Sequence, residues 1–509
     1  MINKIITTNQ LKDIRQRYFA LKKKVVLVHG VFDLVHPGHL EYFSEAKEQG
    51  NILVVSLTSD RYVNKGINKP YFNQKTRSFF LQSLEIVDHV VISDSASSIS
   101  IIKNLKPSYY CKGPDYLKKK GDLAGNLKKE KMVTESYGGK IFFTKGQTFS
   151  STNLINENFN DFNLGKKSID KMFVRKKDRY NLIENFYKTL AKIKKEKILI
   201  IGEIILDSYI YSEALGTPSK ETIISVNYEK KINYLGGTIP VLKNISEINS
   251  DITFASFYKK NSFKKQISKS LNKNIKLKLF NQKNFKEIKK TRFVNATSNE
   301  KFFEYYEFNN NYYENPQLKN YLKKNLNKFD RVIVCDFGHG IVNKDIVKIL
   351  EHKSKNLCVN VQTNSGNRGY NLFTKFTKAN LLCIDEPELR LGLSKRYGNV
   401  SSILREPELA KFKNLMITRG NQGLIFSTNQ KRKKNSLVNF PALNLKVVDT
   451  MGAGDSVFSF VSCMIGNTLD LRSVAIIGSI AGALKTNIKG HSSHVKIDDI
   501  LKSLRTLLK

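Results

Sequence analysis

Two histidines stand three residues apart in the stretch "HGVFDLVHPGHL", residues 29–40. The preceding run "KVVLVHG" is typical of a buried strand, and "PGHLEYFSEAKEQG" predicts a helix that begins near Pro37. His36 and His39 are therefore expected at a helix N-terminus, where backbone amides and the helix dipole favour anions. Zinc would need three or four ligands, and no further Cys, His or acid pair has matching spacing. The pattern favours a phosphate-binding site, with His29 in a structural role.

A second chemical motif is "VVDTMGAGDSVFSFV" at 447–461. Gly452, Ala453 and Gly454 open an apolar helix, so small residues and free backbone amides face the space above it. Asp455 follows at once, and a carboxylate there can take a proton from a hydroxyl while the amides hold a developing phosphate charge. A turn with an ordinary helix cap is the alternative. The full string D-T-x-G-A-G-D favours the catalytic interpretation.

Strands and helices alternate along most of the chain, which predicts an α/β protein with parallel, doubly wound sheets. We expect one such domain at 1–157, a polar and partly helical linker at 158–195, and a second domain at 196–509. Residues 205–235 are rich in Tyr, Ile and Val with period-two stretches, which predicts a small β lid. In open α/β sheets ligands bind at the carboxyl ends of strands, and both motifs fall there.

The composition limits the function classes. The 509 residues imply two or three domains, and 40% hydrophobic residues are enough for buried cores. The net charge of +40 suggests a nucleic-acid binder, but lysine is spread along the whole chain, which favours a compositional bias and no specific nucleic-acid partner. The five cysteines form no CxxC pair, and no apolar run approaches the ~18 residues of a membrane span. We therefore expect a cytoplasmic protein without a membrane partner.

The first motif resembles the G-x-F-D-x-x-H-x-G-H signature of the cytidylyltransferase-like nucleotidyltransferases, over about residues 22–157. It is most similar to the transferase half of the bifunctional heptose kinase/heptose-phosphate nucleotidyltransferases. The resemblance implies a Rossmann-like fold, CTP or ATP as nucleotidyl donor with Mg²⁺, and catalytic roles for His36, His39 and Lys112 at the phosphates. The nucleotide-binding residues that it implies are Gly30, Phe32, Asp33, Gly38, Lys65, Arg77, Gly113, Ser150, Ser151 and Thr152.

The second motif resembles the signature of the ribokinase-like sugar kinases, over roughly residues 196–509. The resemblance implies that ATP donates its γ-phosphate, that Asp455 is the base, and that Gly452, Ala453 and Gly454 form the anion hole. The further residues that it implies are Thr418, Arg419, Gly420 and Gly423 for ATP; Asp207, Gly236 and Gly237 for sugar; and Asp385 and Glu388 for indirect contact with Mg²⁺.

The two resemblances together predict a bifunctional enzyme that phosphorylates a sugar and joins a sugar phosphate to a nucleotide. A heptose phosphate is the candidate substrate, with the transferase first, in reverse of the order in the heptose enzymes. Pro240 stands where the kinases usually have a sugar-binding Asn, and Asp385 replaces another Asn. The alternative is that only the transferase half is active and the kinase-like half is degenerate or acts on an unrelated small molecule. We also expect a homodimer through the lid, because the unpaired backbone groups of exposed strands can pair with a second copy.

Overall fold

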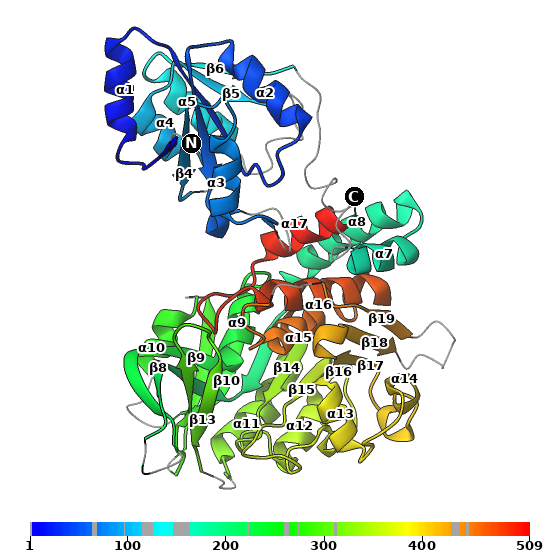
Figure 1. The fold of residues 1–509 in the computed structure, drawn as a ribbon. Coiled ribbons are helices and arrows are strands. Elements are labelled where there is room, and N and C mark those ends of the chain that lie inside the picture. The colour runs from blue at the N-terminus through cyan, green and yellow to red at the C-terminus, as the bar shows by residue number, and fades with distance from the viewer. Residues whose placement is uncertain are drawn as a thin grey trace. The chain divides into compact units, whose positions relative to one another are not determined.

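The structure is a computed structural model with two compact units, Met1–Asn163 and Leu164–Lys509, each described by itself (Figure 1). It describes residues 3–63, 69–95, 97–113, 126–145, 163–218, 220, 223–258, 264–272, 274–282, 284–309, 313–428, 437–443 and 447–508.

The first unit is built on a six-stranded sheet with the order β1-β4-β3-β2-β5-β6, and all of its pairings are parallel. The strands are β1 (Ile5–Ile6), β2 (Val25–Gly30), β3 (Ile52–Thr58), β4 (His89–Ser93), β5 (Tyr109–Lys112) and β6 (Lys140–Phe143). The helices are α1 (Leu11–Ala20), α2 (Pro37–Lys47), α3 (Gln74–Gln82), α4 (Ile99–Leu105) and α5 (Asn126–Glu135).

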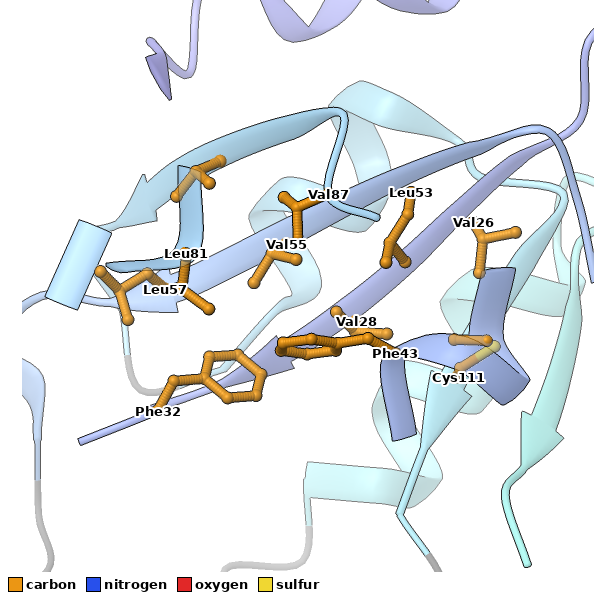
Figure 2. Close-up of a cluster of buried hydrophobic side chains, with 12 residues drawn as sticks. Val26, Val28, Phe32, Phe43, Leu53, Val55, Leu57, Leu81, Val87 and Cys111 are labelled. Carbon is orange, nitrogen blue, oxygen red and sulfur yellow. The ribbon is translucent and has the colours of Figure 1, made fainter. Parts of the chain in front are cut away.

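Each face of this sheet has its own apolar core, because side chains alternate across a strand and both faces are covered. On one face Phe43 of α2 and Leu81 of α3 pack on Val26, Val28 and other strand residues, as Figure 2 shows. On the other face α1 and α4 cover Leu27, Val54 and their neighbours. The two layers of helices fix the carboxyl ends of β2 and β5, where the histidine motif and Lys112 lie.

The second unit contains a nine-stranded sheet with the order β11-β10-β7-β14-β15-β16-β17-β18-β19, parallel as far as β17 and antiparallel beyond it. Figure 1 shows α9, α15 and α16 on one face and α11, α12 and α13 on the other. The strands are β7 (Ile198–Gly202), β10 (Ile252–Tyr258), β11 (Ile275–Asn281), β14 (Arg331–Asp336), β15 (Leu357–Val361), β16 (Leu381–Asp385), β17 (Asn414–Thr418), β18 (Leu424–Thr428) and β19 (Leu437–Phe440). The helices are α7 (Asn163–Met172), α8 (Lys176–Ile193), α9 (Thr238–Ser246), α10 (Lys264–Ser270), α11 (Pro316–Asn325), α12 (Lys344–Lys353), α13 (Glu386–Gly392), α14 (Val400–Ile403), α15 (Ala453–Met464), α16 (Leu471–Thr486) and α17 (Ile497–Leu507).

A separate four-stranded sheet forms the lid, with the order β13-β12-β8-β9. The strands β8 (Ile204–Gly216) and β9 (Ser225–Gly237) lie where the β lid was predicted, and they form an antiparallel pair. The sequence did not predict their partners β12 (Ile288–Asn295) and β13 (Lys301–Glu307). Because β12 pairs in parallel with β8, Lys290 lies directly beside Asp207 on the neighbouring strand, with Arg292 two residues further along β12.

The stretch predicted as a linker includes α8, which belongs to the second unit and packs on the rest of it. Leu182, Phe186 and Ile193 on one side of this helix are buried, and Thr189 hydrogen-bonds Thr468 at 3.0 Å between the two hydroxyl oxygens. Burial of an apolar stripe of this kind stabilises a helix more than its intrinsic propensity does.

The two-domain α/β fold with a small β lid is confirmed. Within the described ranges, no helix is long and apolar enough to cross a membrane.

Candidate active sites

The histidine motif forms the connection between β2 and α2. His36 is the N-cap residue of α2 and His39 lies in its first turn, so their imidazole rings stack with centroids 3.9 Å apart and planes 20° apart. Phe32 has a left-handed backbone (φ 47°), and its ring packs edge-on against His39 at 5.3 Å. A Cβ at Gly30 would come within 2.9 Å of that ring, so a larger residue there would push the ring away from this position. The structure therefore brings the two predicted histidines together at a helix N-terminus.

Asp33 joins this connection to the loop before α3. Its two carboxylate oxygens accept hydrogen bonds from the backbone amides of Tyr71 and Phe72, each at 2.9 Å, and the side chain is buried. The carboxylate is thus committed to fixing the loop, while its predicted place in nucleotide binding stays a prediction.

Arg77, predicted to neutralise phosphate, is fully buried in α3. Its guanidinium donates to the backbone carbonyls of Phe72 and Thr58, each at 2.9 Å, to that of Val31 at 2.5 Å, and to the Asp60 carboxylate at 2.6 Å. These bonds occupy the planar set of donors that a phosphate would need. In this structure Arg77 braces the loops that follow β2 and β3, and the geometry gives no support to a phosphate contact.

Lys112 ends β5 and is also buried, with its ammonium 2.9 Å from Glu130 of α5. The ammonium lowers the pKa of Glu130, against the effect of burial. Burial, and next the charge of Lys112, lower the pKa of His29 to about 4, so this imidazole is neutral and hydrogen-bonds Ser56 at 2.9 Å. Gly113 follows with open space beside its Cα. Lys65, Ser150, Ser151 and Thr152 lie outside the described residues.

The second motif lines a cavity of about 560 Å³ in the second unit. Gly452 is the N-cap residue of α15 with φ 72°, a left-handed conformation that favours glycine. The predicted residues that line the cavity are Asp385, Glu388, Thr418, Gly420, Gly423, Gly452, Ala453, Gly454 and Asp455. Arg419 does not line it, because its guanidinium pairs with Glu386 at 2.7 Å. Nine predicted residues, from the ends of β16 and β17, the turn after β17 and the starts of α13 and α15, thus share one cavity.

Asp455 lies in the first turn of α15, and its Oδ1 accepts a hydrogen bond of 2.6 Å from Nε2 of Gln362. Burial raises the pKa of the Asp455 carboxyl, while His491, the bond from Gln362 and Lys485 each act to lower it. A carboxylate held in one orientation with a raised pKa suits proton transfer from a hydroxyl.

Asp207, predicted to contact sugar, is buried at the base of the lid. Arg292 of β12 donates to its Oδ1 at 2.6 Å, and His491 Nε2 lies 3.3 Å from its Oδ2. A Cβ at Gly236 would overlap this carboxylate, so the glycine is required by the close approach of β9. Gly237 adopts φ 62° as the N-cap residue of α9. The structure brings these three residues together, and the Asp207 carboxylate already has Arg292 and His491 as partners.

Asp385 and Glu388 form a capping box at the start of α13. Asp385 accepts from the Glu388 amide at 2.7 Å, and Glu388 accepts from the amides of Asp385 and Thr363, each at 2.8 Å. Burial, and next the charge of Asp385, raise the pKa of Glu388 to about 8. In the described ranges no group of three His, Cys, Asp or Glu residues could hold a metal ion. The indirect contact of this pair with Mg²⁺ stays a prediction.

Four residues near this site were missed from the sequence: Gln362, Arg292, His491 and Lys485. Gln362 lies in the stretch "NVQTNSGN", which belongs to neither of the two motifs. The other three lie in segments without a motif and reach the site only through tertiary contacts.

A cavity that combines a helix N-terminus, an oriented carboxylate and glycine-bearing strand ends defines a phosphotransferase of the α/β class. Residues 195–496 match the family described as pfkB family carbohydrate kinase, and residues 27–158 match the family described as cytidylyltransferase-like. The chain belongs to the pfkB family of carbohydrate kinases, with a cytidylyltransferase-like domain before the kinase domain.

Curated relatives match the N-terminal part of the chain. The "Bifunctional protein HldE" of Geobacter metallireducens is 36% identical over 159 residues, which are 30% of this chain and 31% of that protein. The protein of the same name from Helicobacter pylori strain P12 is 44% identical over 100 residues, or 19% and 22% of the two chains. The match thus spans less than a third of these relatives. Among solved structures, phosphofructokinase-2 from Escherichia coli has a TM-score of 0.50 and 14% identity, and covers 62% of this chain and 100% of its own.

Proposed function

We propose that the chain is a bifunctional enzyme. Its C-terminal unit phosphorylates a sugar with ATP, and its N-terminal unit transfers a nucleotidyl group from a nucleoside triphosphate to a sugar phosphate and releases pyrophosphate. The observation that carries the proposal is Asp455, oriented by Gln362 beside the Gly452–Gly454 turn in a cavity of about 560 Å³.

In the proposed kinase reaction the sugar oxygen forms a bond to the γ-phosphorus as the bond to the β-phosphate oxygen breaks, and the hydroxyl proton passes to Asp455. The amides of Gly452–Gly454 and the dipole of α15 stabilise the charge on the transferred group. Thr418, Gly420 and Gly423 line the same cavity, which supports a role in binding the nucleotide. Positioning and charge stabilisation provide most of the rate enhancement in such a reaction.

Mg²⁺ is the proposed cofactor, and it would neutralise charge on the triphosphate oxygens. The residues present fit an indirect role, because Asp385 and Glu388 line the cavity while they also accept bonds from backbone amides. These carboxylates would orient water molecules bound to the cation.

In the proposed transferase reaction the nucleophile is a phosphate oxygen that is already anionic, so no general base is needed. The stacked rings of His36 and His39 at the N-terminus of α2 support a role in stabilising charge at the α-phosphate. Lys112 would add positive charge if it exchanged Glu130 for a phosphate. CTP or ATP is the proposed donor.

The resemblance to heptose enzymes and the matches to HldE proteins support a heptose or heptose phosphate as substrate, with the two activities in reverse order along the chain. We further propose a homodimer through the lid. Leu215, Ile224 and Tyr228 on and between β8 and β9, and Phe303 on β13, are all more than half exposed, which supports a partner on this sheet. The free, buried cysteines support a reducing, cytoplasmic location.

The test supplies the full chain with ATP, CTP and a panel of sugars and sugar phosphates that includes heptoses. ADP and pyrophosphate are measured separately. The proposal expects ADP from a sugar and pyrophosphate from a sugar phosphate. Absence of pyrophosphate with every sugar phosphate and both donors would contradict the transferase assignment.

One observation favours the second candidate, in which only the transferase half is active. Both oxygens of Asp207 already have side-chain partners within the protein, Arg292 and His491, and buried Pro240 stands in the first turn of α9 at the family's sugar-binding position. Absence of ADP with every acceptor, together with release of pyrophosphate, would favour that candidate.

A further inference from the structure

Lys485 is a buried cation at the end of α16, with only 2% of its surface exposed. Its ammonium donates to the carbonyl of Gly490 at 2.7 Å and to that of Ile488 at 3.3 Å. Lys112, the other deeply buried lysine of the described chain, pairs with a carboxylate, whereas backbone carbonyls hold Lys485. Burial of an ammonium group is costly, so a position of this kind requires explanation.

The turn that holds Lys485 is bonded to the turn before α15. The carbonyl of Thr486 accepts from the amides of Val448 at 2.9 Å and Asp449 at 3.1 Å. In return the amide of Gly490 donates to the Asp449 carboxylate at 2.8 Å. The ammonium ties residues 488–490 to the end of α16. The bonds to Val448 and Asp449 then tie the end of α16 and this turn to the segment that leads into the anion hole.

The lysine also lies directly behind that anion hole. A Cβ built on Gly452 would be 3.3 Å from Cε of Lys485 and 3.7 Å from Oδ2 of Asp455. The charges of Asp449 and Asp455 raise the pKa of Lys485 against the larger effect of burial, and Lys485 in turn lowers the pKa of Asp455. A fixed positive charge at short range in a poorly solvated site acts strongly on charge that develops nearby.

We propose that Lys485 is a positioning residue for phosphoryl transfer, which supplies a positive charge behind the Gly452–Gly454 amides. It holds the 486–490 turn against the anion-hole turn and favours negative charge on the transferred phosphate and on Asp455. This inference rests on the proposed kinase function. It adds a residue to that function, since Lys485 belongs to neither motif and does not line the cavity.

The test compares two neutral variants with a matched control. Lys485→Met removes the charge and keeps most of the volume, and Lys485→Gln keeps an N–H donor for a carbonyl. The control is Lys496→Met, which removes an exposed lysine of the same C-terminal segment. Kinase kcat and the KM for ATP are measured for each. So are the affinities for MgADP alone and for MgADP with aluminium fluoride, a planar anion that mimics the phosphoryl group in flight.

We expect both Lys485 variants to lose about ten- to hundredfold in kcat and a similar factor in affinity for the aluminium fluoride complex. This is less than the roughly hundred- to thousandfold loss on removal of an oxyanion-hole donor, because Lys485 lies behind the amides. The KM for ATP and the affinity for MgADP should stay within about twofold, because the proposed charge acts on the transferred group. The acid limb of the kcat–pH profile should move to higher pH. The other groups that face Asp455 are unchanged in the variants: His491, Asp207, Glu388, Cys335, Cys383 and Gln362.

Wild-type values of kcat and aluminium fluoride affinity in either folded variant would overturn the inference. Equal losses of affinity for MgADP and for its aluminium fluoride complex would also overturn it. A lowered unfolding temperature with loss of all nucleotide binding in both variants would do the same, because either result would mark Lys485 as a structural residue. If the wild type phosphorylates no sugar, the kinase proposal fails. The two nucleotide affinities still decide the role of Lys485, because they require no acceptor.

Discussion

Gln362→Met tests whether Asp455 works as an oriented base. The substitution keeps the length of the side chain and removes the 2.6 Å hydrogen bond from Nε2 to the Asp455 carboxylate. This bond acts to lower the pKa of Asp455, so its loss raises that pKa further above its ordinary value. The acid limb of the kinase pH profile should therefore move to higher pH.

The magnitude follows from the kind of bond that is lost. A hydrogen bond to a charged group contributes about 1.5–3 kcal/mol, which corresponds to roughly a 10- to 150-fold change in an equilibrium. The ratio of ionised to protonated Asp455 should fall by about that factor at a given pH. On the acid side of the profile kcat should fall in proportion, and it should recover as the pH is raised.

The assay is ADP formation by the full chain at saturating ATP, followed from acid to alkaline pH. Gln282→Met is the matched control, because Gln282 accepts a hydrogen bond from Asn315 in the same unit and does not line the cavity. A Gln362→Met profile that superimposes on the wild-type profile would refute the role of this hydrogen bond.

Three further outcomes follow from the geometry. Arg292→Met leaves Asp207 buried without its nearest cation, and should lower the free energy of unfolding of the second unit by about 3–5 kcal/mol in urea denaturation. A loss under about 1 kcal/mol would contradict this. Because burial lowers the pKa of His29 to about 4, the unfolded chain binds the proton more readily, and the first unit should lose about 1–3 kcal/mol of stability as pH falls from about 6.5 to about 4. His29→Gln should flatten that acid slope, and an unchanged slope would count against it. Gly236→Ala should displace the Asp207 carboxylate and raise the KM for the sugar at least tenfold with a smaller change in the KM for ATP, whereas equal effects on both would speak against a sugar subsite there.

The chemical motifs were predictable from the sequence because each is local. The start of α2 at Pro37 follows from a strand pattern, a proline and a helical apolar face within about 25 residues. The anion-hole turn likewise follows from Gly452 and Gly454, one residue apart at the start of an apolar helix, and the cavity places Gly452–Asp455 beside residues from three strand ends.

The lid was predictable only in part. The period-two pattern of 205–235 predicted β8 and β9, but β12 pairs with β8 across about eighty residues of sequence. Nothing within β12 specifies that partner, because pairing depends on where the intervening chain places the strand.

The roles of single charged residues were the least predictable. The resemblance implies that Arg77 binds the nucleotide. In the structure it is fully buried, and backbone carbonyls and Asp60 accept its hydrogen bonds. Arg292 and His491 reach Asp207 from 85 and 284 residues away along the chain. Long-range contacts of this kind leave no local pattern in a single sequence.

The most direct test of the bifunctional assignment separates the two activities in one chain. Asp455→Asn and a His36→Ala, His39→Ala double variant are assayed side by side for ADP from a sugar and pyrophosphate from a sugar phosphate. We predict that Asp455→Asn loses ADP formation and keeps pyrophosphate release, and that the histidine variant does the reverse. Loss of both activities in either variant, or unchanged turnover in Asp455→Asn, would contradict two independent active sites.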